Sequence, residues 1–294
     1  MKRLAAVTFF IFLLGQFSTM AQNSKKTELL KVASFNIQYD NSKDKVNTWA
    51  KRLPGVAKVF NKYQFDIVGA QEPYLSQIKG LLELIPGYTY IGINILGGTD
   101  ILNRHYTPIF YKKDKFEVLD WGTYWYSETP DVPSKGWDAF SMRICTWAKF
   151  KEKESGTEFY FFNNHLDHIG IKARQESVQL LLTKIKVIAE GYPVIVTGDF
   201  NLNQHHANYA TLNNSGLIKD SYHLAKNRRN SEMTTYNGYK QDLSGSNRID
   251  HLFVSLNPAI EVRSYRILTD MLKGIYPSDH FPVMLEINIP TKTK

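Results

Sequence analysis

The stretch GYPVIVTGDFN, residues 191–201, carries the chain from a helix into a buried strand that ends in polar residues. Before it, apolar residues recur at helical spacing over residues 172–190. Gly191 and Pro193 stop that helix, and the apolar run Val194-Ile195-Val196 is typical of a strand buried on both faces. A helix that leads directly into a buried strand favours an α/β or α+β layered fold over an all-β barrel.

Short apolar or alternating runs recur along the whole chain and predict many strands. The runs are Leu30–Ile37, Asp66–Ala70, Tyr88–Ile93, Thr107–Tyr111, Ile144–Phe150, Glu158–Asn163, Pro193–Thr197, Ile249–Val254, Ile260–Ile267 and Phe281–Ile289. Two further helical patterns lie at residues 52–63 and 75–84. No Pro/Gly/Ser-rich linker and no internal repeat interrupts the sequence, which therefore predicts a single domain over residues 22–294.

The N-terminal 21 residues are expected to be removed rather than folded. Lys2 and Arg3 precede an apolar run from Leu4 to Phe17, and a small-residue stretch ends at Ala21, which is the pattern of a secretory signal peptide. The later sequence contains no stretch that approaches the roughly 20 apolar residues of a membrane span. We therefore expect an exported protein, periplasmic or extracellular, without a transmembrane segment in its mature chain.

The composition suits an anionic ligand but does not identify it. The formal net charge is +8, and the basic residues are scattered, with the densest group at Lys226, Arg228 and Arg229. Charge alone does not separate nucleic acid from a small phosphate ester. The one cysteine, Cys145, cannot form an intramolecular disulfide, and its place within an apolar strand predicts a buried, inert thiol.

Polar residues cluster at the ends of several predicted strands. They are Asn36 in SFNIQYD, Glu72 in QEP, His165, Asp167 and His168 in NHLDH, Asp199 and Asn201 in GDFN, Asp250 in RIDHLFVS, and Asp279 and His280 in PSDHFPV. Carboxylate and carboxamide oxygens suit a hard cation such as Mg²⁺, for which Mn²⁺ can substitute, and imidazoles can move protons. Together these residues predict a metal-assisted hydrolytic site.

Each of these residues also has a plainer interpretation. Asp199 suits an Asx-turn, Glu72 a carboxylate at a helix start, and Asp250 a charge paired with Arg248. Their combined occurrence favours a site over separate structural roles. A zinc site is a weaker alternative because the spacing of its candidate ligands matches no common zinc signature; these ligands are His165, His168, His205 and His206.

The same segments, in this order, resemble those of the endonuclease/exonuclease/phosphatase superfamily, which includes deoxyribonucleases, sphingomyelinases, inositol-polyphosphate phosphatases and nocturnin-like deadenylases. The resemblance spans about residues 30–289 and is specific in the combination of GDFN with SDHFPV. Longer stretches such as SETPDVPSKGWDAF resemble an exported bacterial branch, distantly similar to the carbon-catabolite-repressor deadenylases. The fold this implies is a two-sheet β-sandwich flanked by helices, the deoxyribonuclease I-like four-layer architecture, with its site at one end.

The resemblance also implies roles for the metal and the attacking water. Glu72 would be the main Mg²⁺ ligand, with Asn36 and Asp279 nearby. His280 would be the general base, oriented by Asp250. The reaction implied is an in-line attack of water on phosphorus, without a serine or cysteine nucleophile.

Further residues are implied to contact the phosphate. Asp199 and Asn201 resemble the groups that align the water and bind the phosphate. His165 resembles a histidine that hydrogen-bonds a non-bridging oxygen, and Tyr111 is expected to contact the phosphate. These residues would complete the catalytic centre.

One position departs from the pattern of the family. Many relatives place a glutamate before the IFYK strand, where it can pair with the histidine that corresponds to His165. Here the segment reads NRHYTPIFYKK, with His105 at that position and Arg104 before it. We expect Arg104 and His105 to add positive potential for an anionic substrate.

The segment WGTYWYSETPDVPSKGW, residues 121–137, is rich in aromatic side chains. Trp125 and Trp137 are expected to stack on a nucleobase or a sugar. The alternative is that Trp121, Tyr124 and Trp125 belong to a strand and the outer core. On the other side of the site, Asp167 and His168 of NHLDH are expected to face the substrate.

Three functions remain open from the sequence. The first expectation is an exported Mg²⁺-dependent phosphodiesterase acting as a nuclease. The second is a phosphatase or phosphodiesterase for small or lipid-derived phosphate esters, favoured by the scattered basic charge. The third is an inactive ligand-binding module on the same fold, suggested only by His105. No protein partner is implied.

Overall fold

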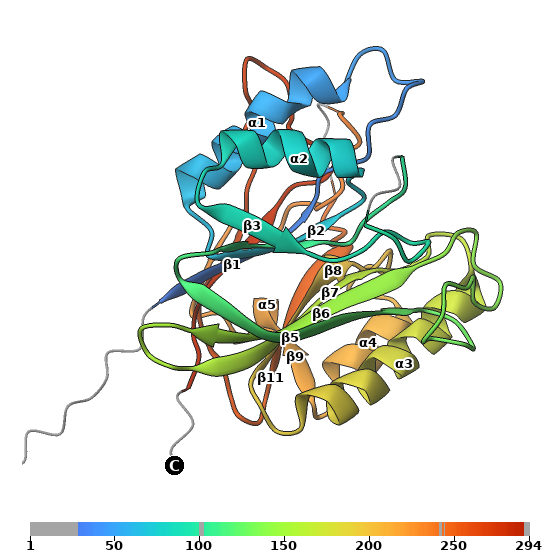
Figure 1. The fold of residues 1–294 in the computed structure, drawn as a ribbon, viewed down its shortest axis with the longest axis vertical. Coiled ribbons are helices and arrows are strands. Elements are labelled where there is room, and N and C mark those ends of the chain that lie inside the picture. The colour runs from blue at the N-terminus through green and yellow to red at the C-terminus, as the bar shows by residue number, and fades with distance from the viewer. Residues whose placement is uncertain (1–28, 100–102, 241–242, 244, 291–294) are drawn as a thin grey trace, which may run out of the picture.

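Two β-sheets pack face to face, with helices on both outer sides (Figure 1). The computed structural model describes residues 29–99, 103–240, 243 and 245–290, so the predicted signal peptide lies outside the described residues. The two-sheet sandwich flanked by helices that the sequence predicts is confirmed.

The first sheet has seven strands in the order β10-β12-β13-β1-β2-β4-β3. Its strands are β1 (Leu30–Asn36), β2 (Ile67–Gln71), β3 (Tyr88–Ile91), β4 (Ile109–Lys112), β10 (Asn227–Arg229), β12 (Glu261–Ile267) and β13 (Val283–Asn288). The second sheet has six strands in the order β5-β6-β7-β8-β11-β9. Its strands are β5 (Phe116–Trp125), β6 (Ile144–Glu152), β7 (Glu158–His165), β8 (Val194–Asp199), β9 (Ile218–Asp220) and β11 (Asp250–Ser255).

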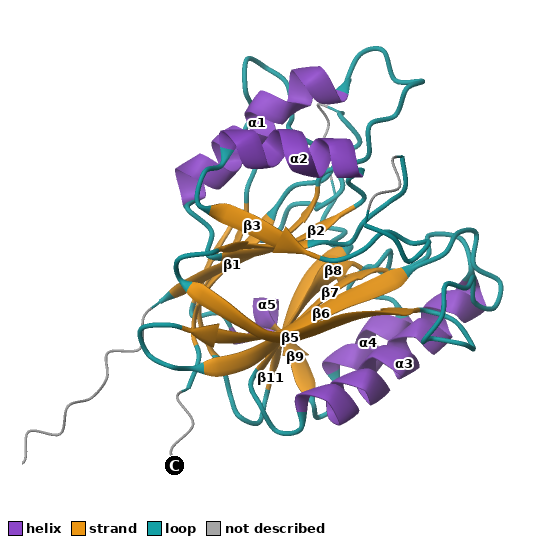
Figure 2. Ribbon diagram, in the orientation of Figure 1, coloured by secondary structure: helices purple, strands orange, loops and turns teal. Residues whose placement is uncertain are grey.

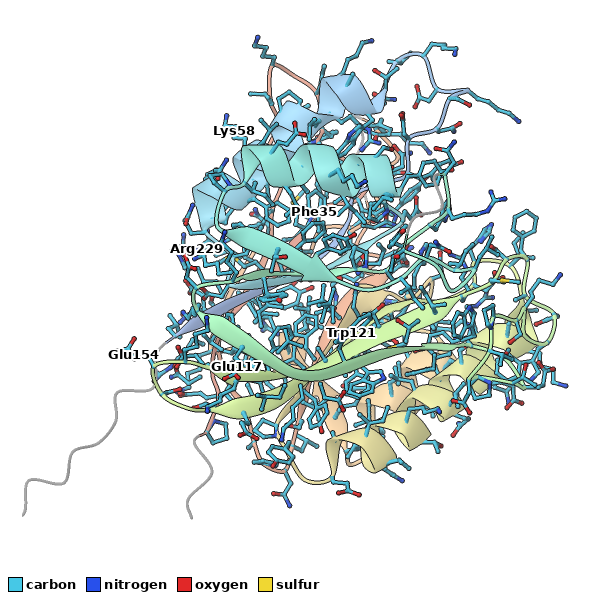
Figure 3. All side chains as sticks on the ribbon, in the orientation of Figure 1. Phe35, Lys58, Glu117, Trp121, Glu154 and Arg229 are labelled. Atoms are coloured by element: carbon cyan, nitrogen blue, oxygen red, sulfur yellow. The ribbon has the colours of Figure 1, made fainter. Side chains whose placement is uncertain are left out.

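Helices cover the outer face of each sheet (Figure 2). Helices α1 (Trp49–Tyr63) and α2 (Leu75–Leu84) bury apolar side chains against the seven-stranded sheet, in a layer that includes Phe35 (Figure 3). Helices α3 (Ile171–Ala189) and α4 (Ala207–Asn213) pack on the six-stranded sheet, and the short α5 (Ser221–Leu224) follows β9. None of the helices within the described ranges is long and apolar enough to cross a lipid bilayer.

The central core lies between the sheets and is rich in aromatic rings. Phe150 packs on Phe159, with ring centroids 5.8 Å apart, and both belong to one buried cluster with Val283, Leu285 and Ile287 of β13. Full burial of one such side chain stabilises the fold by about 1.5–3 kcal/mol. Cys145 is buried as expected, and burial raises the pKa of its thiol to about 12, which keeps it protonated and unreactive.

The predicted strands and helices were found, with ends that differ by a few residues, but several elements were not predicted. Strand β5 escaped detection because only its two ends are buried and its middle is exposed. The alternative interpretation of Trp121, Tyr124 and Trp125 as residues of a strand and the outer core is confirmed for the strand. Tyr124 and Trp125 are buried, whereas Trp121 is exposed and does not belong to the core. The short β9, β10, α4 and α5 lack a periodic apolar pattern long enough to detect.

Strand directions bring the polar strand ends to one end of the sandwich. Strand β1 runs parallel to β2, with Asn36 paired to Gln71, and β7 runs parallel to β8, with His165 paired to Asp199. Strand β11 is antiparallel to β8, so its first residue, Asp250, lies opposite Asp199. The predicted candidates on these strands therefore meet although they are far apart in sequence.

A buried polar junction joins the two sheets below these strand ends. Gln71 Nε2 donates to Asn163 Oδ1 at 2.7 Å, and Thr197 Oγ1 donates to the same oxygen at 3.0 Å. Asn163 Nδ2 donates to the carbonyls of Ala70 and Pro108. Gly69 lies against this junction, where a Cβ atom would overlap Thr197 and Asn163. The junction fixes the relative position of the strands that carry the candidate residues.

Candidate active site

A cavity of about 680 Å³ opens at the end of the sandwich where these strands meet. It is lined by many of the residues predicted from the strand ends, namely Glu72, His165, His168, Asp199, Asn201, Asp279 and His280, and by His105. Two further candidates, Asn36 and Asp250, hydrogen-bond to lining residues from behind. The structure therefore gathers the main predicted residues in one place; their catalytic roles stay predictions.

Asn36 connects two of the carboxylates. Its Nδ2 donates to Glu72 Oε1 and to Asp199 Oδ2, both at 3.0 Å, while its Oδ1 accepts from Gln38 N. In this arrangement Asn36 holds the acidic groups through its amide nitrogen, and its role as a metal ligand stays a prediction. Burial tends to raise the pKa of Glu72, but His105, Asn36 and His280 outweigh it and lower that pKa.

The backbone around these groups is held in an uncommon conformation. Gln38, Glu72 and Asn201 have φ angles of 54°, 76° and 50°. Non-glycine residues in this region cost of the order of 1–3 kcal/mol each, and such strain is often found at functional sites. Here the conformation is supported by hydrogen bonds, because Tyr39 N donates to Glu72 Oε2 and Asn201 N donates to Asp199 Oδ1.

His280 and Asp250 form a buried dyad. Nδ1 of His280 lies 2.9 Å from Asp250 Oδ2, and Nε2 lies 3.7 Å from Asp199 Oδ2. Burial tends to lower the pKa of His280, but Asp250 and Asp199 outweigh it and raise that pKa well above its ordinary value. The pKa of Asp199 rises to about 7, because it is buried and lies near Asp250. The geometry fits an imidazole oriented by one carboxylate, with Nε2 directed toward the other acidic groups.

Arg143 lines the cavity and was not among the residues predicted for the site. Its Nη1 donates to His165 Nε2 and its Nη2 donates to His168 Nδ1, both at 3.0 Å. Burial and Arg143 lower the pKa of His165 well below its ordinary value, so His165 is a neutral acceptor. The positive charge beside His165 is thus carried by the guanidinium, which keeps further N–H groups for a ligand.

The expectation that Asp167 faces the substrate is wrong. Its side chain is buried and accepts hydrogen bonds from the backbone N–H groups of Phe140, Ser141, Ile169 and Gly170. It also pairs with Arg143 Nε at 3.3 Å. Asp167 therefore anchors the loop of Phe140 and Ser141, the loop of Ile169 and Gly170, and the guanidinium of Arg143 behind the cavity.

Tyr111, Trp125 and Trp137 are also corrections, because none of them lines the cavity. Tyr111 lies opposite Ile67 at the start of β2, whereas Glu72 follows the end of that strand, and its ring packs on Phe150 in the core. Trp125 is buried, and its Nε1 donates to the Ile95 carbonyl. Trp137 is half-buried against the core beneath α3.

The expected source of positive potential is likewise corrected. Arg104 is exposed and does not line the cavity, and burial lowers the pKa of His105, which favours its neutral form. His105 does line the cavity, beside the rings of Tyr39 and Tyr74. Among the lining residues that the structure describes, Arg143 is the one Lys or Arg.

Two of the plainer structural interpretations also have clear outcomes. Asp199 does form an Asx-turn through Oδ1, but its Oδ2 remains directed to Asn36 and the cavity. Asp250 does not pair with Arg248, which instead donates to Asp220 at 3.0 Å. Two of the four candidate zinc ligands have other positions: His206 caps α4, and His205 is exposed. In the described part of the chain, neither of them joins a cluster of potential metal ligands.

Several other lining residues were missed by the sequence analysis. They are Tyr39, Tyr74, Phe140, Ser141, Tyr236 and Ile249. The ring of Phe140, which is 66% exposed, lies 5.3 Å from His168, and the ring of Tyr236, 48% exposed, lies 5.0 Å from His280. Tyr39 lies within the motif segment SFNIQYD and Tyr74 follows QEP directly, and this was the signal available in the sequence.

The chemistry of the lining residues fits a hard divalent cation. Oxygen atoms of Glu72 and Asp199 lie within 4.8 Å of one another in a group with His165, and Asp279 adds a third carboxylate to the cavity. Burial and the neighbouring Glu72 raise the pKa of Asp279, although His280 opposes this shift. Carboxylate oxygens in a polar cavity are suitable ligands for Mg²⁺ or Mn²⁺.

Comparisons with known proteins place this site in a family. Residues 33–280 match the model of the Endonuclease/Exonuclease/phosphatase family. A family member from Bacteroides thetaiotaomicron is 41% identical with a TM-score of 0.84, covering 90% of this chain and 98% of that chain. A mannosyl-6-phosphatase from B. thetaiotaomicron VPI-5482 is 42% identical with a TM-score of 0.82, covering 88% of this chain and 99% of that one.

A curated relative shows the same full-length correspondence. It is the uncharacterized protein L388 of Acanthamoeba polyphaga mimivirus, 27% identical over 275 residues that cover 87% of this chain and 99% of the viral protein. Both the family match and the solved relatives agree with the resemblance seen in the sequence. The chain therefore belongs to the endonuclease/exonuclease/phosphatase family and is a phosphoester hydrolase.

Proposed function

We propose that the protein is a divalent-metal-dependent phosphatase that acts on small phosphate monoesters, with sugar 6-phosphates as its substrate class. The observation that carries this proposal is one polar cavity that holds the His280–Asp250 dyad, three carboxylates and the Arg143 guanidinium. Its volume of about 680 Å³ is suited to a small-molecule ligand. The mannosyl-6-phosphatase that is 42% identical supports the sugar phosphate.

Each group has a part that follows from its position. Neutral His280 would accept a proton from the attacking water through Nε2, because Nδ1 is held by Asp250. Arg143 would donate to a phosphoryl oxygen, where negative charge accumulates in the reaction. Glu72 and Asp279 would hold the cation, with Asp199 and Asn36 next to them. A bound Mg²⁺ would supply Lewis-acid stabilisation of the phosphoryl oxygens.

The distribution of charge favours a small ester over a polymer. Among the cavity-lining residues that the structure describes, Arg143 is the one Lys or Arg. The densest basic group, at Lys226, Arg228 and Arg229, lies on or beside β10 at the edge of the seven-stranded sheet (Figure 3). A nucleic acid needs several cations along its phosphate backbone, and the cavity does not extend into such a row.

A nuclease is the second candidate, because exposed Phe140 and Tyr236 stand at the cavity and aromatic rings can stack on bases. The test is phosphate release by the purified protein from hexose 6-phosphates, glycerol 3-phosphate and nucleotides, beside cleavage of single-stranded RNA and DNA. We expect phosphate from the hexose esters with Mg²⁺ or Mn²⁺, loss of that activity in EDTA, and intact polymers. Shortened polymers with untouched sugar phosphates would reject the phosphatase in favour of the nuclease.

The matched variants are Glu72→Gln in the cavity and Glu117→Gln at the exposed surface of β5 (Figure 3). Removal of the predicted metal ligand should lower kcat/KM at least about 100-fold, comparable with loss of one oxyanion-stabilising group. The surface variant should behave like the wild type. Equal activity in both variants would show that Glu72 has no part in the reaction.

We also propose that the protein is exported. The support is the sequence pattern of residues 1–21, in which Lys2 and Arg3 precede the apolar run. N-terminal sequencing of the protein from its native host should find a chain that begins near Gln22. A chain that still begins at Met1 would contradict export through a cleaved signal peptide.

A further inference from the structure

Three aromatic rings stand side by side at the cavity, next to Glu72. The centroid of the His105 ring lies 4.9 Å from that of Tyr39 and 5.4 Å from that of Tyr74, and the two tyrosine rings are 5.6 Å apart. All three residues line the cavity and are half-buried. We call Tyr39, Tyr74 and His105 the aromatic wall.

The aromatic wall is not part of the protein's core. None of its residues packs into the three apolar clusters formed by the described residues, although Tyr106, the neighbour of His105, does. Aromatic side chains that remain half-exposed at a polar cavity keep apolar area available for a ligand. The ring faces are therefore placed where they can contact a substrate rather than stabilise the fold.

Buried Gln77 ties together two of the segments that carry the wall. Its Oε1 accepts from Asp40 N at 2.8 Å and from Tyr74 N at 3.0 Å, and its Nε2 donates to the Gln38 carbonyl at 2.9 Å. One carboxamide thus links both neighbours of Tyr39 to the start of α2. The backbone segments that carry Tyr39 and Tyr74 are thus held in place before any ligand binds, which reduces the entropy lost on binding.

Two more hydrogen bonds connect the wall to the predicted catalytic centre. Tyr39 N donates to Glu72 Oε2 at 3.2 Å, and Tyr106 N donates to the Pro73 carbonyl at 2.9 Å. The first places Tyr39 beside a predicted metal ligand, and the second ties the His105 segment to the residue that follows Glu72. A substrate whose phosphate binds to Arg143 and to a cation held by the carboxylates would bring its leaving group close to these rings.

We propose that the aromatic wall binds the ring of a pyranose phosphate, by packing the C–H face of the sugar on Tyr39, Tyr74 and His105, and that Gln77 is the residue that positions it. This proposal rests on the proposed phosphatase function and names the residues that select the leaving group. Aromatic faces carry partial negative charge and attract the polarised C–H bonds of a sugar. Glycerol phosphate, which has no ring, would not gain this contact.

The test compares two esters with the same phosphate group, a hexose 6-phosphate and glycerol 3-phosphate. The measured quantity is the ratio of their kcat/KM values, which removes effects common to both substrates. In Tyr39→Leu and Tyr74→Leu this ratio should fall about three- to tenfold each, the range expected for one ring contact, mainly through KM of the hexose ester. His105→Phe should keep the ratio, and His105→Ala should lower it.

Gln77→Leu keeps the bulk of the side chain but removes its hydrogen bonds, so it should also lower the ratio. A purely structural role would reduce the activity on both esters equally and leave the ratio unchanged. The control is Tyr192→Leu. Tyr192 is half-buried like the tyrosines of the aromatic wall, but it lies just before the start of β8, whereas the cavity residue Asp199 lies at the end of that strand. Its ratio should equal that of the wild type.

Ratios within twofold of the wild type in both Tyr39→Leu and Tyr74→Leu, in folded variants, would overturn the proposal. If the wild type hydrolyses nucleoside monophosphates but not hexose phosphates, both the proposed function and the pyranose assignment fail. If it hydrolyses no ester, calorimetry with hexose 6-phosphate decides: binding weakened by Tyr74→Leu supports the wall without the activity, and absence of binding overturns it.

Discussion

The dyad of His280 and Asp250 gives the sharpest mutational prediction. Asp250→Asn keeps the size of the side chain but removes the charge that orients His280. The two residues are 6% and 1% exposed, and Nδ1 lies 2.9 Å from Oδ2, so water does not screen or replace the interaction. The variant should therefore be impaired in activity more than in folding.

The size of the effect follows from this geometry. A hydrogen bond to a charged group contributes about 1.5–3 kcal/mol, and each 1.36 kcal/mol corresponds to a tenfold change in rate. The loss of orientation alone should thus lower kcat/KM by about 10- to 150-fold. An asparagine can also donate its N–H to Nδ1, which would place the imidazole proton on Nε2, the nitrogen predicted to accept the proton of water. In the Ser-His-Asp triad the same Asp→Asn exchange lowers kcat about 10⁴-fold, and this value is the upper limit of the loss that we expect for Asp250→Asn.

The pH dependence provides a second readout for the same variant. Asp250 and Asp199 raise the pKa of His280 against the effect of burial, and a base must be neutral to act. In the wild type, activity should rise with pH through this raised pKa; in Asp250→Asn, which lacks the main partner charge, the rise should move to lower pH. The stability of the fold should change with pH in the opposite direction. Because the pKa of His280 is raised in the folded state, protonated His280 stabilises the fold below the ordinary pKa of histidine, and this stabilisation is lost as the pH rises through the raised pKa.

The assay is kcat/KM for the best phosphate ester between pH 5 and 10, at saturating Mg²⁺. Asp131→Asn, in a side chain that is 85% exposed, is the matched control and should match the wild type. A loss of less than threefold at every pH, with the acidic limb unmoved, would refute the orienting role of Asp250. The water would then need another base.

Two further predictions concern the residues behind the site. Gly69→Ala should lower the free energy of unfolding by about 1–3 kcal/mol or more, because its Cβ would overlap Thr197 and Asn163 in the junction between the sheets. An unchanged midpoint of urea unfolding would show that the junction can adjust to the added methyl group. Asp220→Asn should cost about 3–5 kcal/mol at pH 7 by leaving buried Arg248 unpaired. Burial opposes ionisation of Asp220, but His251 and Arg248 outweigh it and lower the pKa of that carboxyl. The stabilisation from ionised Asp220 is therefore present above about pH 4 and is lost as the pH falls. The stabilities of the wild type and the variant should converge toward pH 2, and an equal difference at pH 2 and pH 7 would contradict this.

The sequence predicts most of the fold because its strands are short, strongly apolar and bounded by polar residues. Strand β8, with its apolar run before Asp199, is such a case. Helix α3, which precedes it, was predicted from the helical spacing of its apolar residues. Strand β5 was not predicted because its middle is exposed, and periodicity reports only what is buried. Arg143 was not predicted as a site residue for another reason: its significance lies in contacts with His165 and His168, on a neighbouring segment, which no local pattern reveals.

The error at Tyr111 is a matter of strand direction. His105 lies four residues before the start of β4, whereas Tyr111 lies within that strand. Because β4 is antiparallel to β2, the later residue lies opposite the start of β2, away from Glu72. The motif therefore marked the right strand, but its direction decides that only the residue before the strand reaches the cavity.

Asp167 and Asp199 show what a motif leaves undetermined even at the correct end of a strand. Asp199 is the last residue of β8, and Asp167 lies two residues past the end of β7 in the same sheet. Each accepts the backbone N–H of the residue two positions later, which is an Asx-turn. Asp167 also accepts N–H groups from Gly170, from Phe140 and Ser141 of a distant loop, and from the Arg143 side chain, and so has no oxygen left for a ligand. Asp199 meets the side chain of Asn36 instead and keeps its second oxygen beside the cavity. The number of donors that the distant chain brings to a carboxylate thus decides whether it anchors the structure or serves the site.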